Sequence, residues 1–169
     1  GCTDLMVRGV EALHRMERVI DLLGVPELRG IREVDGGLEI GATTPFSEIR
    51  RSAVVRSAFP ALAEAAGQIG GWQIQNRATL GGNLANASPA GDSLPALLAL
   101  DATVVLASAR GPREIPYDTF HTGYRKTAIQ PGEIVARIRL PFPAEGTVQS
   151  FRTVGTREAQ AISKVVVAL

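Results

Sequence analysis

Cysteine is nearly absent from this sequence, and its scarcity excludes whole classes of site. Cys2 is the only cysteine among the 169 residues. One thiol cannot form a disulfide within the chain, and it cannot supply the four thiolates that hold an iron–sulfur cluster. Any such cluster must be held by another chain or domain. His14 and His121 are the only histidines, and neither belongs to a ligand motif, so we expect no metal site.

Long apolar runs and clustered positive charge are also missing. No segment approaches the ~20 apolar residues that cross a bilayer, and no leader sequence opens the chain. The 18 Lys+Arg nearly balance the 17 Asp+Glu, and no basic run is longer than Arg50–Arg51, which argues against a nucleic-acid surface. We therefore expect a cytoplasmic protein. Because the sequence starts without Met and stops within the valine run 165–167, we also expect a piece of a longer chain.

The sequence does have an ordinary globular composition with strand and helix patterns in mixed order. Hydrophobic residues make up 45% of it and charged residues 21%, which suits a buried core. Periodicity and turn signals predict its elements. The expected strands are Val19–Leu23, Ile31–Val34, Leu38–Ile40, Thr103–Ala107, Arg113–Pro116, Glu133–Leu140, Phe151–Val154 and Lys164–Val167. The expected helices begin at Pro45 with Thr44 as N-cap, at Pro60, and at Ser93.

The most informative segment is Ala78–Asp92, in which most side chains are small and Asp92 carries the only formal charge. Gly81 and Gly82 permit positive φ and let backbone N–H groups approach a ligand, as in anion-binding nests. Short polar donors in the segment are Thr79, Asn83 and Ser88. Because Lys and Arg are absent from it, the pattern favours a diphosphate neutralised by backbone dipoles, with a helix N-terminus at Asp92–Ser93.

Taken alone, this segment is equally compatible with a tight turn followed by an ordinary loop. It matches neither a Walker A sequence nor the spaced glycines of a Rossmann turn. A second segment, Gly1–Asp4, has the same glycine, hydroxyl and carboxylate character. Together the two segments predict a two-sided clamp for one dinucleotide.

Several segments, in this order along the chain, resemble the FAD-binding domain of molybdopterin dehydrogenases, the family of xanthine dehydrogenase flavin domains and carbon monoxide dehydrogenase medium subunits. The segments are Gly1–Leu5, Ile40–Thr44, Ala78–Asp92 and Gly123–Thr127. The resemblance covers nearly the whole chain. One departure is Cys2, which stands where glycine is usual.

This resemblance implies an α+β, two-lobed FAD-binding fold of the vanillyl-alcohol-oxidase/PCMH type. A small α/β lobe would span residues 1–43, and a larger antiparallel-sheet lobe residues 44–146. Residues 147–169 would start a C-terminal α/β flavoprotein domain that is truncated here.

The resemblance also implies where FAD would lie. The diphosphate would lie between the two small-polar segments, with Asp92 near the diphosphate or the ribityl chain. Ile69 and Gly70 would lie near the isoalloxazine ring, and Ile134 and Val135 near the adenine half. The implied cofactor-binding residues are Gly1, Cys2, Thr3, Asp4, Leu5, Ile69, Gly70, Thr79, Gly81, Gly82, Asn83, Ser88, Asp92, Ile134 and Val135.

Two other residues fit two interpretations each. Trp72 suits a core anchor at least as well as a place beside the flavin. Arg125 suits a solvated loop as well as a phosphate or subunit contact.

By the same resemblance, the chain is the flavoprotein component of an oxidoreductase. Electrons from hydroxylation at a molybdenum cofactor would pass through iron–sulfur clusters to FAD, and then to NAD or another acceptor. The implied partners are an iron–sulfur subunit and a molybdopterin subunit. No catalytic acid or base is expected, because the flavin supplies the redox chemistry. Two alternatives stay open: a self-contained flavin oxidase of the vanillyl-alcohol-oxidase type, and a flavin-free assembly module.

Overall fold

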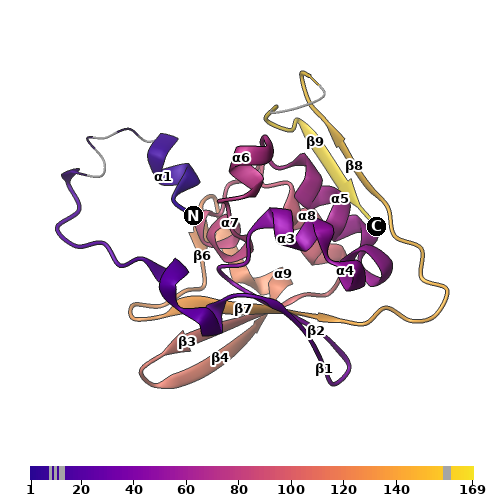
Figure 1. Cartoon of the computed structure of the whole chain (residues 1–169), viewed down its shortest axis with the longest axis horizontal. Coiled ribbons are helices and arrows are strands. Elements are labelled where there is room, and N and C mark those ends of the chain that lie inside the picture. The colour runs from indigo at the N-terminus through magenta and orange to yellow at the C-terminus, as the bar shows by residue number, and fades with distance from the viewer. Residues whose placement is uncertain (8, 10, 12–13, 158–160) are drawn as a thin grey trace.

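A five-stranded antiparallel sheet carries a layer of short helices on one face (Figure 1). The computed structural model describes residues 1–7, 9, 11, 14–157 and 161–169. The strands, in spatial order, are β1 (Ile31–Val34), β2 (Gly37–Gly41), β7 (Ile134–Pro141), β3 (Thr103–Ser108) and β4 (Gly111–Pro116). All neighbouring pairs are antiparallel. The predicted α+β class with an antiparallel sheet is therefore confirmed.

The hairpin β1–β2 belongs to this main sheet, because β2 pairs along its whole length with β7. The sheet thus crosses the boundary predicted between residues 43 and 44. The three-part division of the chain stays a prediction.

The helices on the sheet are short and come from the middle of the chain. They are α3 (Phe46–Arg51), α4 (Ala53–Ala58), α5 (Pro60–Gln68), α6 (Trp72–Gln75), α7 (Leu80–Asn86), α8 (Ser93–Ala99) and α9 (Tyr117–Phe120). The predicted helices at Pro60 and Ser93 are confirmed. Among the described residues, no helix combines the length and the apolar character needed to cross a bilayer.

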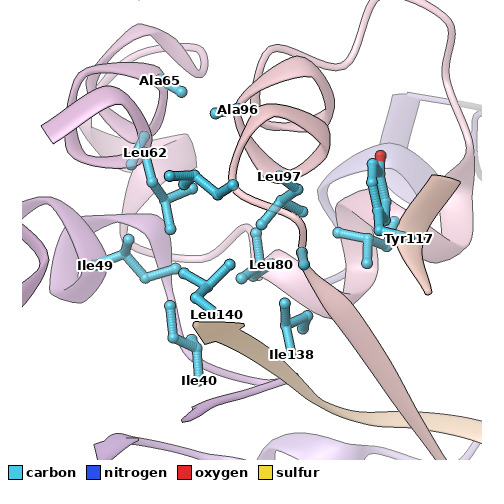
Figure 2. Close-up of a cluster of buried hydrophobic side chains, with 14 of the residues drawn as sticks. Ile40, Ile49, Leu62, Ala65, Leu80, Ala96, Leu97, Tyr117, Ile138 and Leu140 are labelled. Atoms are coloured by element: carbon cyan, nitrogen blue, oxygen red, sulfur yellow. The ribbon is translucent and has the colours of Figure 1, made fainter. Parts of the chain in front are cut away.

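The core lies between this helical layer and the sheet. Ile40, Ile138 and Leu140 point from the strands toward Leu80 and Leu97 of the helices (Figure 2). Burying a side chain of this kind contributes roughly 1.5–3 kcal/mol. The predicted alternation of Ile134, Ala136, Ile138 and Leu140 on one face is interrupted. A register shift opposite Val105 and Leu106 puts Val135, in place of Ile134, among the core residues.

One local prediction near the N-terminus is wrong. Val19–Leu23 is not a strand: its end enters the 3₁₀ turn η1 (Leu22–Gly24), where the Asp21 carboxylate accepts the Leu23 N–H at 2.9 Å. A second 3₁₀ turn, η2 (Pro26–Leu28), follows. Such local side-chain hydrogen bonds compete with strand pairing.

Helix α3 begins one residue later than predicted, at Phe46, with Pro45 as its N-cap. Thr44 does not cap it. The Thr44 hydroxyl instead accepts the Gly30 N–H at 2.9 Å and lies 3.1 Å from the Gly30 carbonyl. Thr44 therefore ties the start of the helical layer to the residue before β1.

A separate hairpin of β8 (Phe151–Val154) and β9 (Val165–Ala168) lies against the helices, away from the main sheet (Figure 1). Both strands were predicted. A two-stranded ribbon is marginal by itself, and this one is anchored by the buried ring of Phe151 and the partly buried Val166. The N-terminal helix α1 (Thr3–Val7) lies on the other side, near α6 and α7. It contributes no buried residue.

Candidate functional site: a cavity with two walls

A cavity of about 630 Å³ separates the N-terminal residues from α6, α7 and the turn that follows α7. Its size is typical of small-molecule sites, which measure about 300–1,000 Å³. The structure brings both predicted segments to it. The predicted residues that line it are Gly1, Cys2, Thr3, Asp4, Leu5, Ile69, Gly70, Thr79, Gly82, Asn83, Ser88 and Asp92.

Three predicted residues do not line this cavity. Gly81 is buried against Ala42 on the other side of α7. Val135 is 7% exposed and lies in the core, and Ile134 is an exposed residue at the start of the central strand β7. The association of Ile134 and Val135 with the adenine half of FAD stays a prediction.

The segment expected to be a loop forms the helix α7, with Thr79 as its N-cap. Its first backbone donors are already used within the protein. The N–H of Leu80 donates to the Thr44 carbonyl at 3.3 Å, and that of Gly81 to the Ala42 carbonyl at 2.9 Å. The N–H of Gly82 donates to Thr79 Oγ1 at 3.2 Å. The predicted nest of free backbone N–H groups is therefore wrong at these positions.

The paired glycines are required for space, since both have helical backbones without positive φ. A Cβ on Gly81 would lie 2.5 Å from the Ala42 Cβ, a distance that packed atoms do not adopt. A Cβ on Gly82 would lie 2.9 Å from Thr79 Oγ1. Gly81 thus lets α7 approach the end of β2, and Gly82 keeps the cavity side of the helix open.

Side chains supply the donors that the backbone does not. Thr79 Oγ1 and Ser88 Oγ each accept a backbone N–H, from Gly82 and from Ala90. A hydroxyl that accepts one hydrogen bond still has its own proton to donate. Both hydroxyls, together with the Asn83 amide, belong to the cavity lining. This donor set is suited to phosphate oxygens.

Asn83 has a partner that the sequence did not reveal. The Ser93 hydroxyl donates to Asn83 Oδ1 at 2.7 Å, and Ser93 is fully buried. Ser93 was predicted only as part of a helix start. No local pattern connects it with Asn83, because the contact forms only when α8 folds back beside α7.

Asp92 lies where the cavity meets a second one. The second cavity, of about 640 Å³, is lined by α5 residues, β8 residues and Ser163 as well as by Asp92. Burial raises the pKa of Asp92, and a hydrogen bond from the Ser163 hydroxyl to its carboxylate opposes that rise. Thr153 in turn donates to Ser163 at 3.0 Å. The β8–β9 hairpin thus holds the Asp92 carboxylate through a chain of two hydroxyls.

The N-terminal wall has a tight backbone geometry. A Cβ on Gly1 would lie 2.0 Å from the Arg77 carbonyl oxygen, so only glycine can approach the backbone at Arg77 so closely. Cys2 has φ of 60°, in the left-handed region that glycine occupies without cost. The glycine usual at this position in the resembled family is thereby explained by backbone conformation. An L side chain there costs about 1–2 kcal/mol.

Arg125 and Trp72 can also be placed. Arg125, in the turn between β5 (His121–Gly123) and β6 (Lys126–Thr127), lines the first cavity and brings a cation to it. Trp72 is 65% exposed, with the Arg50 guanidinium 4.5 Å from its ring centroid. Its interpretation as a core anchor is therefore wrong.

The structure also places one of the histidines. The Nε2 atom of His121 lies 3.1 Å from the carbonyl oxygen of Leu84, at the C-terminal turn of α7. Within the described residues, no group of three or more His, Cys, Asp or Glu side chains could hold a metal ion.

Comparisons with known proteins identify the family. Residues 1–143 match the family described as FAD binding domain in molybdopterin dehydrogenase. The nicotinate dehydrogenase FAD-subunit of Eubacterium barkeri is 36% identical over 98% of the chain and 57% of its own length. The xanthine dehydrogenase FAD-binding subunit of Escherichia coli O157:H7 is 34% identical, with the same shares covered.

A solved structure of carbon monoxide dehydrogenase from Hydrogenophaga pseudoflava, lacking the Mo-pyranopterin moiety, superposes with a TM-score of 0.90. It is 33% identical to this chain and covers 96% of it, which is 56% of the matched subunit. The chain thus spans a little over half the length of the relatives it matches. The family match and these likenesses show that the chain belongs to the FAD-binding domains of molybdopterin dehydrogenases.

Proposed function

We propose that the intact protein passes electrons from the iron–sulfur clusters of a partner subunit, through FAD, to NAD or another acceptor. FAD is the cofactor of the family to which the chain belongs. The observation that carries the proposal is the first cavity, because two segments far apart in the sequence, residues 1–5 and 79–92, line it together. A long, phosphate-bearing cofactor held between two walls suits that arrangement.

The residues present fit the different parts of FAD. Neutral donors from Thr79, Asn83 and Ser88 and the charge of Arg125 suit the diphosphate. The Asp92 carboxylate can accept hydrogen bonds from ribityl hydroxyls. Ile69 and Ile74 give the cavity an apolar wall beside Gly70, which suits a flat aromatic ring.

FAD would supply the redox chemistry when bound, and the chain's residues would bind, orient and shield it. A Cβ on Gly70 would lie 2.8 Å from the Ile74 Cβ, and Gly70 has φ of 54°. Gly70 therefore lets the chain turn tightly beside Ile74 in the cavity lining. We assign no side chain at the cavity to proton transfer, because the role proposed for the lining residues is to bind and orient the cofactor.

The proposed partners follow from what this chain lacks and from its relatives' names. Its single cysteine cannot hold an iron–sulfur cluster. Its relatives are called FAD-subunits and medium chains of dehydrogenases. We therefore assign the clusters to a partner iron–sulfur subunit, and the molybdopterin cofactor to a further subunit where the organic substrate reacts.

The cofactor site is tested in the purified full-length protein by its visible absorbance. Flavin bands, or FAD binding after cofactor removal, are expected. Gly82→Leu should abolish flavin retention by filling the cavity from α7. Gly24→Leu is the matched control, because a Cβ on Gly24 has nothing within 4 Å. Flavin retention in a folded Gly82→Leu protein would show that this cavity is not the FAD site.

The electron path is tested in the assembled complex without oxygen. Organic substrate should bleach the flavin absorbance, and NAD should restore it if NAD is the acceptor. Bleaching of the isolated chain by an organic substrate, with no partner subunit, would favour the self-contained flavin oxidase. Absence of any flavin binding would favour the assembly module.

A further inference from the structure

A buried hydroxyl lies behind the cavity at the start of α8. Ser93 is fully buried, and its Oγ donates to Asn83 Oδ1 at 2.7 Å. Asn83 lines the cavity, whereas Ser93 does not. We propose that Ser93 is a positioning residue that selects one orientation of the Asn83 amide, so that its NH₂ group faces the diphosphate of FAD. This inference rests on the proposed cofactor site.

An asparagine amide can take two orientations of almost the same shape, which differ in where the oxygen and the NH₂ group lie. In the observed orientation, Oδ1 faces Ser93 and the NH₂ donors are left for the cavity. Turning the amide over would leave the Ser93 proton without the acceptor it has now. Because Ser93 is buried, water could not replace that acceptor, and an unsatisfied buried donor is costly.

Asn83 Oδ1 lies beside the turn before α8, because the Cβ that Gly91 lacks would lie 3.2 Å from it. A carbonyl oxygen turned toward the cavity would instead meet the negative diphosphate. Ser93 therefore makes Asn83 a donor toward an anion.

This orientation matters more because the backbone of α7 contributes little at its start. The N–H groups of Leu80, Gly81 and Gly82 are bonded within the protein. Side-chain donors must take their place at the diphosphate. We expect the Asn83 NH₂ group to act on the diphosphate and not on the isoalloxazine ring.

The test is a double-mutant cycle in the full-length protein, with dissociation constants measured for FAD, ADP and riboflavin. ADP carries the diphosphate without the flavin, and riboflavin carries the flavin without phosphate. Ser93→Ala and Asn83→Ala should each weaken FAD binding by about tenfold, equivalent to about 1.4 kcal/mol. The double variant should bind FAD no more weakly than Asn83→Ala alone, because Ser93 acts through Asn83.

Ligand selectivity separates this role from a general structural one. Ser93→Ala should weaken ADP binding together with FAD binding, and leave riboflavin binding within about twofold. Ser47→Ala, a buried serine on α3 outside the cavity lining, is the matched control. Unchanged FAD affinity in Ser93→Ala, or an equal loss in the Asn83→Ala background, would overturn the inference.

Asn83→Asp gives an independent reading if Ser93→Ala does not fold. The carboxylate still accepts from Ser93 but presents its second oxygen to the diphosphate. It should weaken FAD and ADP binding more than Asn83→Ala does. Affinity equal to that of the unsubstituted protein would overturn the inference. If the unsubstituted protein binds no FAD at all, the proposed function itself fails.

Discussion

The two walls of the cavity are built in opposite ways. The α7 wall is continuous with the core: Leu80 and Leu84 are fully buried, and the Phe46 N–H donates to the Ala78 carbonyl at 3.1 Å. The N-terminal wall has no buried residue in α1, where Met6 is 59% exposed and Val7 87% exposed.

This difference indicates that the core holds the α7 wall in place, whereas the N-terminal wall would be held by contacts with a ligand in the proposed cofactor site. Few contacts of α1 offset the entropy of ordering its backbone, which costs roughly 1–2 kcal/mol per residue. Contacts with the cofactor are expected to supply the rest of the free energy needed to order α1. Substitutions on the core side of α7 should therefore lower the stability of the fold, whereas substitutions in the N-terminal wall should act on cofactor binding.

The largest effect is expected where the α7 wall meets the sheet. Gly81→Val would force side-chain atoms against Ala42 and should lower the free energy of unfolding by about 3 kcal/mol, as strong overpacking does. Urea denaturation monitored by circular dichroism measures it. Gly24→Val, at an open position, should change stability by less than about 0.5 kcal/mol. Equal losses in both variants would show that α7 is not packed as described.

Cofactor binding should protect the N-terminal wall and leave the α7 wall nearly unchanged. With FAD at 100 times its dissociation constant, hydrogen exchange at Met6 should slow by up to about 100-fold. The amides of Leu80 and Leu84 should exchange slowly with or without FAD. Mass spectrometry of peptides from each wall measures both. Equal protection of the two walls by FAD would contradict the comparison.

Asp92 extends the preformed wall toward the β8–β9 hairpin, and its link to Ser163 should depend on pH. Burial raises the folded pKa of Asp92, and the Ser163 hydroxyl limits that rise. Ser163→Ala removes that limit, so the charged carboxylate becomes less stable in the folded protein. We expect Ser163→Ala to lower the free energy of unfolding by about 1 kcal/mol at pH 7, a modest value because the Asp92 carboxylate is partly exposed.

The sign of this pH dependence can be checked in the same variants. A raised carboxyl pKa costs stability above that pKa, and the cost disappears as the pH falls below the unfolded value near 3.9. The difference between Ser163→Ala and the unsubstituted protein should therefore shrink from pH 7 toward pH 3. In an Asp92→Asn background it should not vary with pH, and variation there would assign the effect to another group.

The smallest effect is expected at Cys2 in the N-terminal wall. Cys2→Gly removes the strain of φ 60° but makes the unfolded segment more flexible, and the two effects partly cancel. FAD binding should become about two- to threefold tighter with unfolding free energy unchanged. Cys2→Val, with a β-branched side chain in the same conformation, should weaken binding. Tighter binding by Cys2→Val would contradict the left-handed backbone.

The parts of the fold that were predictable are those determined by neighbouring residues. The hairpin around Gly36, which has φ of 74°, and the helix begun by Pro60 follow from local turn and helix signals. The membership of the β1–β2 hairpin in the main sheet did not follow, because β7, the partner of β2, lies more than 90 residues later in the sequence. The apolar pattern of residues 19–23 predicts a strand, but the Asp21 side chain caps the turn η1 and takes the Leu23 N–H that a strand would use for pairing.

The site was predictable to the same extent. The small residues of positions 1–4 and 78–92 indicated two facing segments, and the structure brings both to one cavity. The sequence could not show that the N–H groups of Leu80 and Gly81 are already bonded, because their acceptors, the carbonyls of Thr44 and Ala42, lie more than 30 residues earlier in the chain. The role of Ser93 was equally hidden, since its contact with Asn83 requires two helices to pack.

The bond from Gly81 to the Ala42 carbonyl has a consequence for protein engineering. Together with the bridge between Pro45 and Thr79, this hydrogen bond ties the start of α7 to the residues that follow β2. Moving residues 78–92 alone into another scaffold would leave the first donors of α7 without acceptors. To keep the conformation of residues 78–92, the transplanted piece would have to include β2 and the turn to Phe46, so that the strand and the helix are moved together.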